Sequence, residues 1–364
     1  MMSQDANAGL TADANGSSTS PGDRMATSSR RLLLEIGFTG LLVAGFAYGT
    51  LYFNQLFAYF TPATPGSTPA TPGQPQPSVG LQVFEALLPT GVLVLLSLIE
   101  RLTPPAGPRK SFRSWLLHLQ INLFATFMFV PAGILTVIIS SALSRHLGFR
   151  LGLFDLEFAH GTGLLVFFAA VWVSSISQDF FFYWFHRALH KSSFLWQHHK
   201  MHHMDPELEA LSVSRQNWLE AFLQMVFISI PLAIFFRTDT LNALAVGLLG
   251  TTIGTFYVTI LTLGHMNVRF QVGWASLFFC SPQIHRIHHS RLPQHRDRNF
   301  AFILPLWDVL FGTYYAPAHD EFPPTGVDGE KEIGSFWESQ IYTQREWWKM
   351  FRACRRLRLD SAPI

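Results

Sequence analysis

Long apolar stretches without charge are the feature that most limits how this chain can fold. No Asp, Glu, Lys or Arg occurs between Glu35 and Glu85, and a second uncharged stretch runs from Ser114 to Ser144. Because crossing about 30 Å of hydrocarbon takes roughly 20 mostly apolar residues in a helix, such runs are typical of membrane spans. Several runs of this length are hard to hide in a water-soluble core, so we expect an all-α, integral membrane helical bundle.

The sequence predicts four spans followed by an apolar hairpin of two segments, which either spans the membrane or re-enters it. We expect these six segments at Ile36–Ala58, Val79–Ile99, Ser114–Ser144, Phe158–Phe185, Ala221–Phe236 and Thr240–Gly264. Lys and Arg concentrate in cytoplasmic loops, and they occur before the first span, between the second and third, and after the fourth. This distribution predicts that the loops on the carboxyl side of the fourth span and of the hairpin face the cytoplasm.

Two segments have the composition of irregular chain. Residues 1–29 are rich in Ser, Ala, Gly, Thr and Asp without periodicity, which is typical of a disordered tail. Within a transmembrane region at 30–160, residues 59–78 include the near-repeat TPATPGSTPATPG. Its prolines favour an extended outer loop.

Charge and cysteine content exclude two classes of function. The 26 basic and 24 acidic residues nearly balance, so the chain lacks the basic character needed to bind a nucleic-acid backbone. Two cysteines, Cys280 and Cys354, cannot build a thiolate metal cage or a disulfide framework. Any metal must therefore find other ligands, and the chain has 15 histidines.

Histidines recur at helical spacing in three clusters. The motifs HRALH, HHKMHH and HRIHH, with an additional histidine in GHMN, contain the candidate metal ligands His186, His190, His199, His202, His203, His265, His285, His288 and His289. Residues three and four apart share one face of a helix, so each cluster can point at one centre. Nine imidazoles exceed what one tetrahedral ion accepts, which predicts two metals held close together.

The remaining histidines lie outside this spacing, which bears on whether they are ligands. His198 adjoins the second cluster, and its participation stays open, as does that of His295 in a polar loop. We interpret four others as non-ligands: His118, His146, His160 and His319.

The ligands alone leave the element open, because imidazole suits both iron and zinc. Zinc hydrolases usually carry HExxH, with a glutamate base between two ligands, and this sequence has none. We therefore expect two iron ions that activate O2 as a co-substrate, with zinc possible in purified material.

Carboxylates and amides near the clusters are candidate supporting residues. Asp179 lies seven residues before His186, two turns away on the same helix face, and a ligating imidazole usually donates its other N–H to such an acceptor. Asp297 and Asn299 follow the last cluster and are further candidates. For Asp308 we expect a structural role.

Together with DRNFAFILPLWDVLFGTYY, these histidine motifs resemble the sterol desaturase and fatty acid hydroxylase superfamily of integral-membrane di-iron oxygenases, over roughly residues 165–318. The resemblance implies spanning helices capped by a cytoplasmic helical domain that holds the dimetal site. It places a catalytic domain at 161–318 and a cytoplasmic segment at 319–364. Many members carry a further histidine where this chain has Asn217, whereas Arg215 and Glu220 remain.

The expected function is hydroxylation or desaturation of a lipid from the bilayer, such as a sterol or fatty acyl substrate. No GxGxxG fingerprint is present, so electrons should come from an external donor, a cytochrome, ferredoxin or reduced pterin. The short loops favour a bacterial inner membrane. One alternative is the alkylglycerol monooxygenase branch, which cleaves ether lipids with a reduced pterin and which the SRQ motif resembles. Others are a zinc-dependent membrane hydrolase and a non-enzymatic lipid-binding protein.

Overall fold

The computed structural model describes residues 29, 32–44, 79–147, 154–155, 163–237, 243–270 and 273–360. The tail predicted at 1–29, except Ser29, and the outer loop predicted at 59–78 lie outside this part of the chain. So do residues 45–58 of the first expected span.

Helices dominate the described residues, which confirms the all-α prediction. After a helix over residues 32–44, the α-helices are α2 (Val79–Leu102), α3 (Phe112–Leu147), α4 (Gly163–Lys191), α5 (Ser193–His203), α6 (Trp218–Phe235), α7 (Ala243–His265), α8 (Pro282–His288), α9 (Leu306–Leu310) and α10 (Phe336–Asp360). Short 3-10 helices are η1 (Ala210–Ser214), η2 (Gly273–Leu277) and η3 (Pro293–His295). Two-residue strands β1 (Phe154–Asp155) and β2 (Phe236–Arg237) pair in parallel, with Phe154 opposite Phe236.

Helices α2, α3, α4, α6 and α7 occupy most of the described parts of the expected spans. None of the helices in the described ranges, however, combines the length and the apolarity that crossing a membrane requires.

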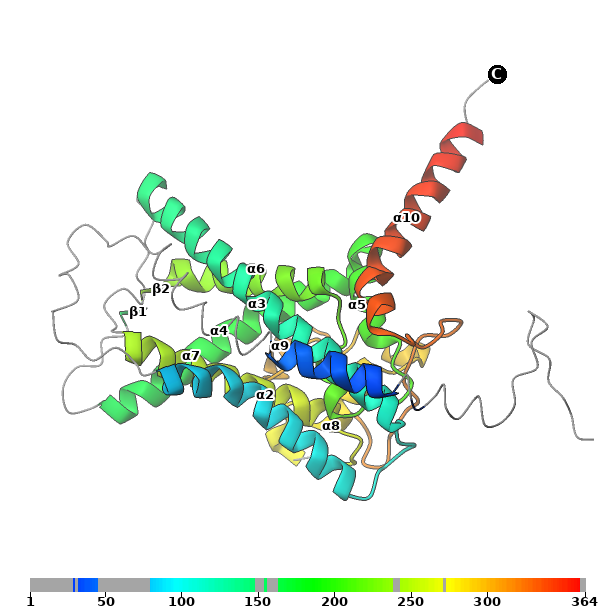
Figure 1. Ribbon diagram of the computed structural model, residues 1–364, viewed down its shortest axis with the longest axis horizontal. Helices are drawn as coiled ribbons and strands as arrows, with labels where there is room; N and C mark the ends of the chain where they lie inside the picture. Colours follow the sequence, from blue (N-terminus) through cyan, green and yellow to red (C-terminus); the bar gives the residue numbers. More distant parts are fainter. Residues whose placement is uncertain are drawn as a thin grey trace, which may run out of the picture.

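The long helices pack beside one another as a bundle (Figure 1). Helix α3 lies along α6, α2 lies along α7, and α4 contacts both α6 and α7. The shorter helices α5 and α8 lie toward the end of the bundle opposite the two strands, and α10 projects away from the body (Figure 1). Helix α5 is held between α4 and α10.

Local capping explains two sharp turns in this part of the fold. Helix α4 ends at Lys191, and Ser192 caps α5 by accepting a hydrogen bond from the Leu195 amide. Ser281 caps α8 in the same way, and Pro282 occupies the first helical position, where its lack of an N–H costs nothing. Both caps begin helices that carry histidine clusters.

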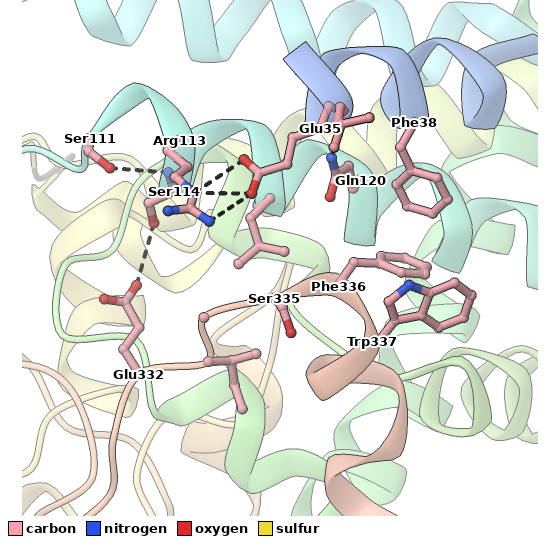
Figure 2. Close-up of a pocket in the computed structure, with 14 residues that line it drawn as sticks. Glu35, Phe38, Ser111, Arg113, Ser114, Gln120, Glu332, Ser335, Phe336 and Trp337 are labelled. Carbon is pink, nitrogen blue, oxygen red and sulfur yellow. Dashed lines mark hydrogen bonds and ion pairs between the residues drawn. The ribbon is translucent and has the colours of Figure 1, made fainter. Parts of the chain in front are cut away.

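The helix over residues 32–44 is attached to α3 by charge. Arg113 donates to Glu35 at 2.8 Å, and Ser114 of the same helix donates to Glu332 in the loop before α10. A cavity of about 400 Å³ lies among these side chains, bounded on its other side by Phe336 and Trp337 (Figure 2).

Candidate metal centre

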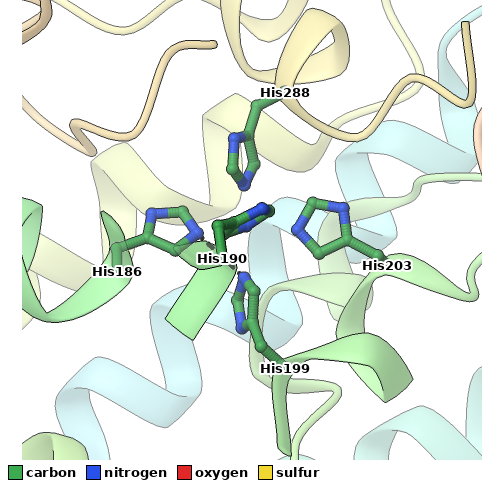
Figure 3. A group of neighbouring side chains, drawn as sticks. All are labelled: His186, His190, His199, His203 and His288. Carbon is green, nitrogen blue, oxygen red and sulfur yellow. Dashed lines mark hydrogen bonds between the residues drawn. The ribbon is translucent and has the colours of Figure 1, made fainter. Parts of the chain in front are cut away.

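The structure brings all nine predicted histidines together in two groups. The first histidine group consists of His186, His190, His199, His203 and His288, and the second consists of His202, His265, His285 and His289. Within each group, one nitrogen from every ring lies within 4.8 Å of the others. In Figure 3 the five rings of the first group converge on a common centre from α4, α5 and α8.

The two groups adjoin because two short helices contribute to both. Neighbours on α5 divide between the groups, since His203 belongs to the first and His202 to the second. On α8, His288 belongs to the first group and His285 to the second. The rings of His203 and His289 stack across the boundary with centroids 4.3 Å apart. The arrangement is that of a dimetal site.

Nitrogen–nitrogen distances within the groups fit ligands that share an ion. The Nε2 atoms of His186 and His199 are 2.8 Å apart. In the second group the Nε2 atoms of His265 and His285 are 3.0 Å apart, and those of His285 and His289 are 3.1 Å apart. Two ligands at about 2.1 Å from one ion and at right angles would be about 3.0 Å apart.

Burial keeps these rings neutral, which is the form that binds metal. Desolvation, followed by the charges of neighbouring rings, lowers the pKa of His186 and His199 well below 6.5. Burial also lowers the pKa of His288 to about 4. The Nε2 atoms of His190, His203 and His288 are buried without a hydrogen-bond partner. Buried polar atoms without partners are rare in folded proteins, and a bound ion would account for three of them at one centre.

Hydrogen bonds on the outer nitrogen fix the orientation of four rings. The Nδ1 atoms of His186, His265 and His288 lie 2.7 to 2.9 Å from the backbone carbonyls of Phe300, Leu261 and Arg298, respectively. His199 Nδ1 lies 2.8 Å from Oε1 of Glu220. A neutral ring that donates from Nδ1 presents its Nε2 lone pair to the centre.

Glu220 is a supporting residue that the sequence reasoning did not assign. It is buried in the first turn of α6 and directly precedes the apolar segment predicted at Ala221–Phe236. Burial raises its pKa well above 4.5. A carboxylate at the edge of an apolar run is energetically unfavourable without a partner. The position of Glu220 in the sequence therefore indicates that this side chain has a partner.

Asp179 takes a different position from the one that we predicted. Its Oδ1 accepts hydrogen bonds from the amides of Phe302 and Ile303, and its Oδ2 accepts one from Leu304. His186 donates to the Phe300 carbonyl instead. Asp179 therefore holds in place the segment that carries this carbonyl. Its effect on the His186 ring is indirect, through the position of that segment. Three backbone donors satisfy both oxygens more completely than one imidazole would.

Asp297 and Asn299 lie beside the centre without entering either group. Asp297 accepts from Lys191 Nζ at 2.6 Å, and its Oδ1 is 4.0 Å from His190 Nδ1, beyond hydrogen-bond distance. The buried Asn299 side chain donates to the carbonyls of Ile284 and Tyr315 and accepts from the Tyr315 amide. Asn299 thus ties α8, which carries His285 and His288, to the segment after α9.

Asp308 accepts hydrogen bonds from the amides of Phe300 and Ala301 and from the Thr313 hydroxyl, which is a structural arrangement.

The two histidines that stayed open lie outside both groups. His198 is buried edge-on against Trp347 of α10, with ring centroids 4.4 Å apart. His295 lies between the Ser290 hydroxyl, 2.9 Å from Nδ1, and Glu321, 3.0 Å from Nε2. His118 and His319 also lie outside the groups, and the side chains of His146 and His160 are outside the described residues.

A buried ionic cluster supports the turn that follows α5, and no periodic pattern in the sequence indicates it. Asp205 is fully buried and pairs with Lys110 and, at 3.4 Å, with Arg215. Burial alone would raise the pKa of Asp205, but the charges of Lys110 and Arg215 hold it well below 3.8. The Lys110 amide also donates to Glu209 at 2.7 Å, so the cluster joins the loop before α3 to η1.

Curated relatives are similar to less than half of the chain. Human alkylglycerol monooxygenase is 32% identical over 146 residues, which cover 40% of this chain and 31% of that protein. Ornithine lipid hydroxylase OlsE of Rhizobium tropici is 28% identical over 159 residues, 44% of this chain and 46% of that protein. Protein CER1-like 2 of Arabidopsis thaliana is 25% identical over 162 residues, 42% of this chain and 25% of that protein.

The chain thus spans between a quarter and a half of the length of these relatives, and no solved structure matches it. Residues 171–313 match the model of the fatty acid hydroxylase family, and this stretch contains all nine histidines of the two groups. The part of the chain that holds the histidines is therefore similar to enzymes of the fatty acid hydroxylase family.

Proposed function

We propose that this protein is an O2-dependent di-iron oxidoreductase that hydroxylates or desaturates a lipid. The observation that carries the proposal is the convergence of nine histidines, eight of them buried, into two adjoining groups inside the family match. They come from α4, α5, α7 and α8 and from the residue that ends α8. We assign His186, His190, His199, His203 and His288 to one iron and His202, His265, His285 and His289 to the other.

Nitrogen spacing supports iron over zinc. Protein zinc sites are mostly tetrahedral, and at bond lengths of about 2.1 Å a tetrahedron places its ligand atoms about 3.4 Å apart. The nitrogens of His186, His199 and His285 lie 2.8 to 3.1 Å from their nearest partners, closer to right-angled coordination. The Nε2 atoms of His202 and His265 are 3.3 Å apart, near the tetrahedral value. A group of five histidines also exceeds the four ligands that zinc usually takes.

The residues of the chain prepare the site, whereas the irons, when bound, supply the reduction of O2 and the abstraction of hydrogen from an unactivated carbon. Burial keeps the imidazoles unprotonated and excludes water. Glu220 and the three carbonyls hold the rings with Nε2 facing inward. Electrons come from a separate carrier, a cytochrome, ferredoxin or reduced pterin.

A lipid substrate and a place at the membrane are parts of the same proposal. Large apolar side chains are exposed on the bundle, including Leu95 and Leu98 on α2 and Leu165 and Phe168 on α4. Contiguous exposed apolar surface is typical of contact with lipid or with a partner protein. We place the histidine-bearing domain at 161–318, on the cytoplasmic side of a bacterial inner membrane.

A second candidate is oxidation of an ether lipid with a reduced pterin. The match to human alkylglycerol monooxygenase, at 32% identity, favours it. The match to the ornithine lipid hydroxylase OlsE favours hydroxylation of a bacterial lipid instead.

Metal analysis combined with lipid mass spectrometry tests the proposal. We expect about two irons per chain in protein purified without chelator, and a cellular lipid whose mass changes by one oxygen or two hydrogens when the gene is expressed. The product should require both O2 and a reductant. Bound zinc with activity under anaerobic conditions would instead establish a hydrolase, and lipid binding without any product would establish a non-enzymatic binder.

A further inference from the structure

A cavity of about 520 Å³ lies where α7 ends and α8 begins. Its walls are apolar and include Ile260, Leu263, Met266 and Phe279. Among its described lining residues, only Arg269 is charged. The volume is in the range of cavities that hold a small organic ligand, and the lining suits a hydrocarbon.

The cavity adjoins the helices that hold the second histidine group. Met266 follows His265 directly in the chain, and Pro282, another lining residue, begins the helix that carries His285. These two histidines are in contact, with their Nε2 atoms 3.0 Å apart. An acyl chain in the cavity would therefore lie against the two helix ends that position this group.

Exposed aromatic side chains surround the same segment. Phe270 is 55% exposed, Trp274 is 82% exposed and Phe278 is 46% exposed, all within the connection from α7 to α8. Aromatic residues grouped in this way are typical of the interface between a membrane and water.

Two arginines flank one phenylalanine beside the cavity. The guanidinium carbons of Arg269 and Arg286 lie 5.2 Å and 3.7 Å from the ring centroid of Phe322. Arg286 is 7% exposed and donates to the Pro323 carbonyl, and within the described ranges neither arginine pairs with a carboxylate.

Two cations beside the same ring, one of them buried, are stabilised by an anion that accepts hydrogen bonds from them.

The cavity near Glu35 differs in this respect. Its arginine, Arg113, is already paired with Glu35 at 2.8 Å (Figure 2). That site therefore offers no comparable free cation among its described lining residues.

We propose that the cavity between α7 and α8 receives one acyl chain of a lipid with a negatively charged headgroup, and that Arg269 and Arg286 bind the headgroup. Phosphate and carboxylate share the required chemistry, because both accept paired hydrogen bonds from guanidinium. Naming this lipid as the substrate rests on the proposed function; its binding does not.

Lipid retention by the full-length protein tests the proposal without turnover. Protein in a nonionic detergent is equilibrated with dioleoyl phosphatidylglycerol or dioleoyl phosphatidylcholine, and bound lipid is counted by native mass spectrometry. We expect the anionic lipid to bind about tenfold more tightly, the value of one hydrogen-bonded charge. Arg269→Gln should remove this preference and Arg269→Lys should keep most of it. Leu263→Trp, which fills the cavity, should weaken retention of both lipids.

Arg291→Gln is the matched control, because Arg291 is an exposed arginine whose partner is Asp328 at 3.6 Å. It should leave retention unchanged. Glycerol phosphate and inorganic phosphate distinguish a lipid from a free anion. If either competes with the dioleoyl lipid at equal concentration, the acyl chain contributes nothing and the proposal is wrong. Equal retention of the two lipids, or an unchanged preference in Arg269→Gln, would overturn it as well.

The outcomes separate this inference from the proposed function. Selective binding that depends on Arg269, with no O2-dependent product from any lipid, would leave the binding site standing and remove the oxidoreductase. Turnover of lipids without regard to headgroup charge would support the oxidoreductase and remove the headgroup site.

Discussion

His199 and Glu220, 21 residues apart, meet through a hydrogen bond of 2.8 Å between Nδ1 and Oε1, with both side chains buried. The bond joins α5 to the first turn of α6, and the second carboxylate oxygen of Glu220 has no hydrogen-bond partner. Glu220 therefore acts on the first histidine group through His199. Because it sets the tautomer and direction of this ring, it is a positioning residue.

Removal of this carboxylate should weaken metal binding. For Glu220→Ala we expect a 10- to 100-fold loss of iron affinity, about the usual effect of deleting a partner of a ligating histidine. Glu220→Gln, whose amide oxygen can still accept the hydrogen bond, should retain more of the affinity. Competitive titration with a chelator measures both, with Glu332→Ala at an exposed position as control. Unchanged affinity in Glu220→Ala would show that the bond does not position His199.

Adjacent buried histidines provide a matched test of the ligand assignment. His199→Ala removes a member of the first group, and we expect activity to fall more than about 100-fold, beyond the effect of losing an outer partner. His198→Ala removes a ring that packs on Trp347 and should keep both irons. Metal content and product formation are measured on the inserted, folded protein. Equal iron content in the two variants would contradict the assignment.

Asn299 should be important for stability. Its side chain makes three hydrogen bonds, and its backbone has φ 56°, in the left-handed region that asparagine tolerates better than alanine. We expect Asn299→Ala to lower the free energy of unfolding by about 2 to 4 kcal/mol. Thermal unfolding monitored by circular dichroism measures this loss. If the free energy of unfolding falls no more than in the exposed control Glu332→Ala, Asn299 does not anchor α8.

Substitution of two aspartates compares how much a buried and an exposed ion pair contribute to stability. Asp205→Asn leaves Lys110 and Arg215 buried without their counter-charge, and we expect a destabilisation of about 3 to 5 kcal/mol. Asp328→Asn breaks an exposed pair with Arg291 and should cost less than about 1 kcal/mol. Chemical denaturation under identical conditions compares the two variants. Similar losses would show that the buried cluster is not sensitive to its charge balance.

The two cysteines report on burial and on sidedness. Burial raises the pKa of the Cys280 thiol well above 9, and its side chain is enclosed, whereas Cys354 on α10 is exposed. A maleimide should label the native protein at Cys354 only, and Cys354→Ser should abolish this labelling until denaturant is added. If α10 is cytoplasmic, an impermeant maleimide should label inverted vesicles but not intact cells. Labelling of intact cells would reverse the proposed orientation.

The histidine groups could be predicted because their spacing is local. Histidines three and four apart on one helix keep the same face whatever the tertiary fold, so spacing identified eight of the nine rings, whereas His265 was matched through the resemblance to the family. The sequence could not divide them, because His202 and His203 are neighbours on α5 and yet join different groups. That division depends on how α5 lies against α7 and α8, which is a tertiary property.

Asp179 shows the limit of the same reasoning. Its spacing placed it on the helix face of His186. Its oxygens instead accept hydrogen bonds from the amides of residues 302–304, in a segment more than 120 residues away. Backbone donors of this kind carry no signature in the sequence. Glu220 was overlooked for the converse reason, since its histidine partner lies on another helix. The limits of the domains and the membrane spans stay predictions.

Because α5 and α8 each contribute rings to both groups, the two ions would be bound by the same two helices. Binding of the first ion would fix both helices and thereby position most of the ligands of the second. Occupancy should therefore proceed nearly all-or-none, so that titration of metal-free protein yields mainly empty and doubly filled molecules with few singly filled ones.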